Sequence, residues 1–194
     1  MARSQETRAR ILECAYDLFY RQGYQATTVD QVIAITGLSK PTVYKHFPSK
    51  EVLAVAYLNE RKAREMGALR EALAAEKNPR ERFLGVVRFI RNALPDGNFR
   101  GCGFFNMTAE IPDRNNPVTR VALSFIHEIR DVIREVTEDV RTADPACASL
   151  NTDEVFEEYY IICCGAIMAC QELHRIDPAD RAIEQVRRLL PQSP

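Results

Sequence analysis

Apolar residues recur along almost the whole chain at the spacing of three and four that gathers side chains on one face of an α-helix. In the first such stretch the apolar stripe runs from Ile11 to Phe19, and Gly23, a residue type common at helix C-termini, follows it. The alternation of apolar and polar residues that is typical of strands is nearly absent. The pattern therefore predicts an all-α protein.

Most of the predicted helices start at an Asn, Asp, Ser or Thr, often followed by proline, and these residue types favour helix N-termini. Between the helices, Pro95-Asp96-Gly97-Asn98 indicates a turn, and Ala143-Asp144-Pro145 ends a helix and begins a loop that continues to Asn151. Outside residues 27–47, the helices are predicted over residues 4–22, 49–75, 78–94, 104–110, 116–141, 152–175 and 177–190.

Residues 27–47 predict two short helices joined by a tight turn. Thr28 and Gln31 have the spacing of a capping box at the start of the first helix, and Gly37 ends that helix. Ser39 then caps the second helix, in which Val43 and Phe47 lie four residues apart on one face. The other face of this second helix is polar and basic, with Lys40, Thr42, Tyr44 and Lys45. Together these features predict a helix-turn-helix.

Charge is distributed unevenly along the 194 residues, although the net charge is only −1. Residues 1–50 contain seven Lys and Arg against four Asp and Glu, so the positive charge lies with the helix-turn-helix. A head that binds nucleic-acid phosphates requires this distribution. The excess is small and would not by itself indicate nucleic-acid binding.

Six cysteines without a CxxC pair or a secretory leader indicate free thiols in a reducing compartment, so we expect a cytoplasmic protein. The longest apolar run, residues 159–170, is much shorter than the roughly 20 residues that span a bilayer. We therefore expect no membrane partner. The 46% hydrophobic content is ample for a folded core.

Residues 8–53 resemble the head of the tetracycline-repressor (TetR) family of bacterial transcriptional regulators. The resemblance rests on four pieces: an Arg-rich first helix that ends in Leu18-Phe19 and Gly23-Tyr24, the start at residues 27–32, the turn and second helix at residues 37–47, and Ser49-Lys50-Glu51-Val52-Leu53. A weaker resemblance, at residues 101–112, is to the start of the sixth helix in some members.

The resemblance implies a nine-helix, omega-shaped homodimer with two domains, a DNA-binding head over residues 1–48 and an effector-binding and dimerisation body over residues 49–194. It also implies a body pocket for a small-molecule effector, which controls the separation of the two heads. The last two long helices are expected to pair with their symmetry mates. Independently of the family, the predicted helix 152–175 is apolar around much of its circumference, with small Gly165, Ala166 and Ala169 permitting close approach.

A two-fold dimer implies a palindromic double-stranded operator with half-sites about one helical turn apart. The family's commoner mode of action is repression. From the resemblance and the helix geometry, the expected DNA contacts are Thr28, Ser39, Lys40, Thr42, Tyr44, Lys45, His46 and Lys50. Among them Lys40, Thr42 and Lys45 are candidates for base edges, and Thr28, Tyr44, His46 and Lys50 for phosphates. In the competing interpretation Tyr44 packs on the core of the head and His46 only bridges helices.

Effector-binding candidates are the aromatic, polar and sulfur-containing residues that follow the long connecting helix, since such groups line apolar ligand cavities. In the competing interpretation, which residues of these types more often follow, any one of the aromatic residues belongs to the plain core and His127 is a core histidine. The candidates are Phe89, Cys102, Phe105, Asn106, Met107, Glu110, Phe125, His127, Arg130, Tyr159 and Cys163.

Two other functions remain open at this point. Cys102 lies between two glycines at a predicted helix start, where its thiol could sense oxidants or electrophiles, although a small residue at a tight helix entry explains it as well. An architectural DNA-binding dimer without effector is the other alternative. Cys170 and His174 are too few ligands for a metal site, and no catalytic motif occurs, so we expect no metal, no cofactor and no enzyme activity.

Overall fold

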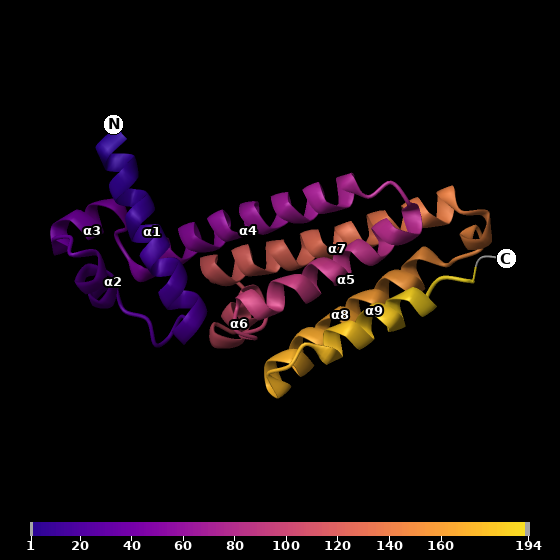
Figure 1. Cartoon of the computed structure of the whole chain (residues 1–194). Helices are drawn as coiled ribbons and strands as arrows, with labels where there is room; N and C mark the ends of the chain where they lie inside the picture. The colour runs from indigo at the N-terminus through magenta and orange to yellow at the C-terminus, as the bar shows by residue number, and fades with distance from the viewer. Residues whose placement is uncertain (1, 193–194) are drawn as a thin grey trace. The chain divides into compact units, whose positions relative to one another are not determined.

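The computed structural model describes residues 2–192, and within them it contains nine α-helices and no strand. The all-α prediction is thus confirmed. In chain order (Figure 1) the helices are α1 (Ala2–Gln22), α2 (Val29–Thr36), α3 (Lys40–His46), α4 (Lys50–Ala75), α5 (Pro79–Asp96), α6 (Gly103–Glu110), α7 (Pro117–Ala143), α8 (Thr152–Leu173) and α9 (Asp177–Arg188).

Helix boundaries agree closely with the predicted ones, with a clear difference at the end of α5. The turn predicted from Pro95 begins later, because α5 continues through Pro95 to Asp96. Proline lacks an amide hydrogen and so cannot donate to the carbonyl four residues earlier, and the helix ends one residue later, at Asp96. After the helix, the Leu94 carbonyl accepts a hydrogen bond from the Phe99 amide, and the Pro95 carbonyl accepts one from the Asn98 amide. In the predicted loop after α7, residues Pro145–Cys147 form one turn of 3₁₀-helix.

The chain forms two compact units, each made of two segments. The head unit consists of Met1–Arg64 with Gly103–Phe125, and the body unit of Glu65–Cys102 with Ile126–Pro194. The head unit is therefore larger than the helix-turn-helix, because it includes α6 and the beginning of α7. The domain boundary predicted after residue 48 lies where the helix-turn-helix motif ends, and it stays a prediction.

The head unit has one core, to which α1, α2, α3 and the start of α4 all contribute. Its buried side chains include Ile11, Ala15 and Phe19 of α1, Val32 of α2, Val43 and Phe47 at α3, and Leu53 and Leu58 of α4. Burial of one large aliphatic or aromatic side chain contributes roughly 1.5–3 kcal/mol. The short helices α2 and α3 are thus held by tertiary packing.

In the body unit, α5, α8 and α9 pack together (Figure 1). Tyr159 of α8 is fully buried, and its ring centroid lies 4.9 Å from that of Phe83 of α5. Its hydroxyl donates to the Phe83 carbonyl at 2.6 Å and accepts from the Val87 amide at 3.1 Å. Those two backbone groups are four residues apart, the pair that a regular α-helix would join, so the hydroxyl ties α8 into the backbone of α5.

Gly37 and Gly67 offer a matched test of the turn between α2 and α3. A Cβ added to either glycine would meet nothing within 4 Å, but Gly37 has φ +64° and ends α2, whereas Gly67 lies inside α4. We expect Gly37→Ala to lower the free energy of unfolding by about 1–2 kcal/mol, because L-residues disfavour left-handed backbone. Gly67→Ala should raise it by about 0.5–1 kcal/mol.

Urea denaturation of both variants, followed by circular dichroism, measures these changes. A Gly37→Ala variant that is as stable as Gly67→Ala would contradict the assigned turn geometry.

Candidate nucleic-acid interface

Helix α2 begins at the capping box that the sequence predicts. The Gln31 amide donates to the Thr28 hydroxyl at 3.2 Å, and the Thr28 amide donates to the Gln31 side-chain oxygen at 2.8 Å. At the other end Gly37 donates its amide to the Ile33 carbonyl at 2.9 Å in left-handed conformation. Hydrogen bonds beyond the regular helical pattern thus stabilise the start of this eight-residue helix, and a left-handed glycine ends it.

Helix α3 has seven residues and begins at Lys40, with Ser39 as its N-cap and Pro41 in its first turn. The Ser39 hydroxyl accepts from the Thr42 amide at 3.3 Å, and Pro41 occupies the first turn, where its missing amide hydrogen is not needed. Val43 and Phe47 are 0% and 2% exposed. The buried side chains of Val43 and Phe47 therefore anchor α3, and the opposite side of the helix is accessible to solvent.

Side chains on the outer side of α3 are polar and accessible. Lys40 and Lys45 are exposed, and the Lys40 ammonium lies 3.4 Å from the Asp30 carboxylate of α2 and 5.8 Å from the Tyr44 ring. Tyr44 is 37% exposed, in contrast to the interpretation that packs it on the core. Thr42 and His46 are half-buried.

Two arginines of α1 support this surface, a role that the sequence pattern did not single out. The Arg10 guanidinium donates to the Thr36 carbonyl at the end of α2, and Arg8 lies 5.1 Å from the centre of the Phe47 ring. Both contacts join residues far apart in the chain, so only the fold reveals them.

Lys50, the first residue of α4, lies at the turn between α1 and α2. Its ammonium donates to the Gln25 carbonyl at 3.3 Å and lies 4.3 Å from the centre of the Tyr24 ring. Partial burial lowers the pKa of Lys50, and the negative charge of Glu110 opposes that shift.

The effector candidates fall into both units. In the head unit, Phe125 stacks on Phe104 with ring centroids 3.7 Å apart, and Met107 is buried. Phe105 and Asn106 are half-buried. The Glu110 carboxylate is directed to the turn between α1 and α2, where it accepts from the Gln25 amide.

In the body unit, Tyr159 and Cys163 are buried, and burial raises the pKa of both groups. Both hydrogen-bonding functions of the Tyr159 hydroxyl are used within the protein. Arg130 pairs with Glu157 at 2.6 Å. Phe89 and Cys102 are half-buried, whereas His127 is exposed and so does not join the buried candidates.

A buried arginine in the head unit was not among the candidates. Arg61 of α4 is 7% exposed, and its guanidinium carbon lies 4.4 Å from the centre of the Tyr20 ring, 5.4 Å from that of Tyr16 and 5.6 Å from that of Phe104. It also donates to the Tyr57 hydroxyl at 2.9 Å. The spacing of four between the two α1 tyrosines and between Tyr57 and Arg61 is the only sequence signal for this cluster.

Within residues 2–192, no group of three or more His, Cys, Asp or Glu side chains is arranged to hold a metal ion. No helix in that range combines the length and the hydrophobicity that crossing a membrane requires.

Two models of known protein families match this chain, one near its N-terminus and one over most of the remainder. The model described as "Bacterial regulatory proteins, tetR family" matches residues 11–57, which contain the helix-turn-helix. The model described as "Tetracyclin repressor-like, C-terminal domain" matches residues 79–186, more than half of the chain.

Similar proteins are named as helix-turn-helix transcriptional regulators or activators. The transcriptional regulator TcmR of Streptomyces glaucescens is 32% identical over 95 residues, which are 49% of this chain and 42% of TcmR. The transcriptional activator FasR of Mycolicibacterium smegmatis is 33% identical over 82 residues, 42% of this chain and 37% of FasR. The chain thus matches less than half the length of these relatives.

Among solved structures, SCO4454 of Streptomyces coelicolor, a TetR-family transcriptional regulator, has a TM-score of 0.84 at 26% sequence identity, over 96% of this chain and 91% of that one. Fold, motif and both family matches lead to one conclusion. The chain belongs to the tetR family of bacterial regulatory proteins, and its helix-turn-helix lies in the part that matches the family's N-terminal model.

Proposed function

We propose that the chain is a homodimeric repressor that binds a palindromic operator through α3 and is released by a small molecule bound in the region after residue 48. The observation that carries the DNA-binding part is the geometry of α3. Its inner side is anchored by Val43 and Phe47, and its outer side presents Lys40 and Lys45. A recognition helix in a major groove requires this combination of a fixed backbone and free polar side chains.

The residues in and around α3 fall into two groups, those suited to base edges and those suited to phosphates. Lys40, Thr42 and Lys45, near the exposed side of α3, are suited to base edges in the major groove. Thr28 at the start of α2 and Lys50 at the start of α4 lie at helix N-termini, where backbone amides and the helix dipole favour phosphate. Tyr44 and His46 are the remaining phosphate candidates.

The dimer is supported by an apolar face of α8. Ile161 and Met168, seven residues apart and therefore on one side of the helix, are 65% and 62% exposed. Gly165 lies between them, and a Cβ there would meet nothing within 4 Å. Large exposed apolar side chains around a glycine are suited to the close approach of a second helix.

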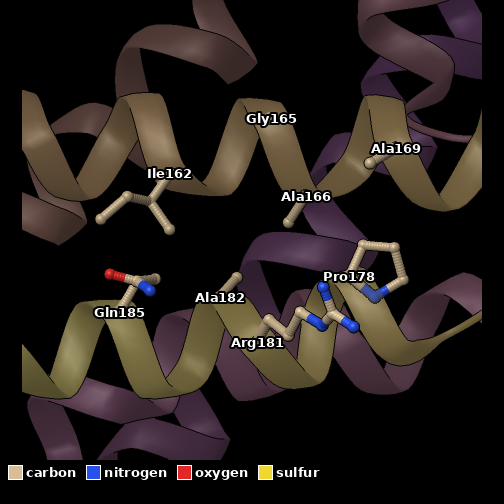
Figure 2. Close-up of a pocket in the computed structure, with 8 residues that line it drawn as sticks. All are labelled: Ile162, Gly165, Ala166, Ala169, Pro178, Arg181, Ala182 and Gln185. Carbon is tan, nitrogen blue, oxygen red and sulfur yellow. The ribbon is translucent and has the colours of Figure 1, made fainter.

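A shallow groove of about 250 Å³ between α8 and α9 lies next to this face. Figure 2 shows Ile162 and Ala166 of α8 directed toward Ala182 and Gln185 of α9 across it. Most of its lining is apolar or small, which is suited to side chains of a second copy of the chain. Two copies related by a two-fold axis would bind two half-sites about one helical turn apart, which is why a palindrome is proposed.

Release by a small molecule is supported by the family match of residues 79–186 to a tetracyclin repressor-like C-terminal domain. That description also favours repression, although the relative FasR is named an activator. Among the residues predicted to bind the effector, Phe89, Phe105 and Asn106 are half-buried and so retain surface that a small molecule could contact.

Lys45 and Lys77 provide a matched test of the DNA contact. Both are exposed lysines, but Lys77 lies in the connection between α4 and α5. On a palindromic duplex selected from a random pool, Lys45→Ala should weaken binding about 10- to 100-fold, because one base contact contributes roughly 1–3 kcal/mol. Lys77→Ala should change it less than about twofold.

Fluorescence anisotropy at two salt concentrations measures both affinities and their salt dependence. Equal losses in the two variants, or none in either, would contradict a role of α3 in recognition.

Ile161 and Ile35 provide the corresponding test of the dimer, being 65% and 62% exposed. Ile161→Glu should shift the sedimentation mass from that of a dimer to the 22.1 kDa of one chain, because it places two charges in the apolar interface. Ile35→Glu, on α2, should remain a dimer. Wild-type chain that sediments at 22.1 kDa at micromolar concentration would refute this interface.

A further inference from the structure

The turn between α1 and α2 is bound by the last residue of α6, which is 85 positions away in the chain. The Gln25 amide donates to the Glu110 carboxylate at 2.7 Å, and the Gln25 side-chain amide donates to the Glu110 carbonyl at 3.3 Å. All of these residues belong to the head unit. Glu110 therefore binds both the backbone amide and the side-chain amide of Gln25.

Gly23 allows the carboxylate to come this close. Its φ is +90°, and a Cβ built on it would lie 2.3 Å from a Glu110 carboxylate oxygen. Real Cβ atoms do not approach other heavy atoms so closely, so no other residue type fits beside Glu110 without displacing it. The turn and the end of α6 are thus in direct contact.

Lys50 binds the same residue of the turn, Gln25, at its carbonyl. Its ammonium donates to the Gln25 carbonyl, while the Glu110 carboxylate binds the Gln25 amide. The charge of Glu110 also acts on the Lys50 ammonium. The Gln25 backbone is therefore held between an acidic and a basic side chain that come from α6 and α4.

Only Ala26 and Thr27 separate Gln25 from Thr28, the N-cap of α2. Thr27 is 1% exposed, its hydroxyl donates to the Gly23 carbonyl at 2.7 Å, and its amide donates to the Tyr24 carbonyl. Thr28, the next residue, caps α2 and is a proposed phosphate contact. A turn this short and this strongly bonded leaves Thr28 little freedom once Gln25 is placed.

We propose that Glu110 is a positioning residue for DNA binding, which places Thr28 and Lys50 for their phosphates by clamping Gln25. In this role the C-terminal end of α6 is part of the DNA-binding apparatus, although it lies outside the helix-turn-helix. The proposal rests on the proposed DNA-binding function.

The sign of the expected effect separates this role from simple electrostatics. Removal of a carboxylate makes a protein more positive, so on charge alone it strengthens binding to DNA. Positioning predicts the opposite, because Thr28 and Lys50 lose their defined places when Gln25 is released.

Glu110 and Glu60 form a matched pair for the test, since Glu60 is an exposed glutamate of α4 in the same unit. On the selected palindromic duplex, Glu110→Ala should weaken binding about tenfold and lower the salt slope by about 1, as one phosphate contact is lost. Glu110→Gln, which keeps an acceptor oxygen, should weaken it about threefold. Glu60→Ala should leave binding equal or slightly tighter.

Amide hydrogen exchange gives a readout that needs no DNA. In Glu110→Ala the Gln25 amide should exchange at least about fivefold faster, while the amides inside α3 keep their protection and so report a folded head. If Glu110→Ala and Glu110→Gln bind as tightly as Glu60→Ala, or if Gln25 exchange is unchanged, the positioning role is overturned. Wild-type chain that binds no palindrome refutes the proposed function instead, and Gln25 exchange then still decides whether the clamp exists.

Discussion

The seven-residue helix α3 is too short to be stable on its own in water, and the DNA-binding surface depends on the two side chains that anchor it. Val43 and Phe47 are almost completely buried, and the Ser39 cap supplies a partner for an amide of the first turn. With the backbone fixed from within, the lysines on the outer side have defined positions. The DNA contacts that we propose for α3 depend on this division between a buried and an exposed face.

The same constraint extends beyond the motif. The head unit also contains α6 and the beginning of α7, so its structure includes residues about 60 positions after the helix-turn-helix. Glu110 of α6 bonds to the turn before α2, and Phe104 of α6 lies against the buried Arg61 of α4. The end of α6 is therefore in direct hydrogen-bonded contact with the turn that leads into α2.

Local signals made the helices and the turn predictable from the sequence. Thr28, Gly37 and Ser39 act on residues at most four positions away, so their types alone indicate where α2 and α3 begin and end. Long-range partners carry no such signal: nothing near Glu110 indicates that its carboxylate binds Gln25 rather than a ligand. His127 is another case, because its apolar neighbours in the sequence suggested burial, whereas the side of α7 on which it lies is exposed.

In the proposed function, α3 is the part of the chain that enters the DNA. A crystal structure of the chain with its selected duplex would show whether it does. We expect two copies related by a two-fold axis, each with the N-terminal half of α3 in a major groove, about 34–36 Å apart along the duplex. A complex in which α3 faces solvent while another surface binds the duplex would contradict it.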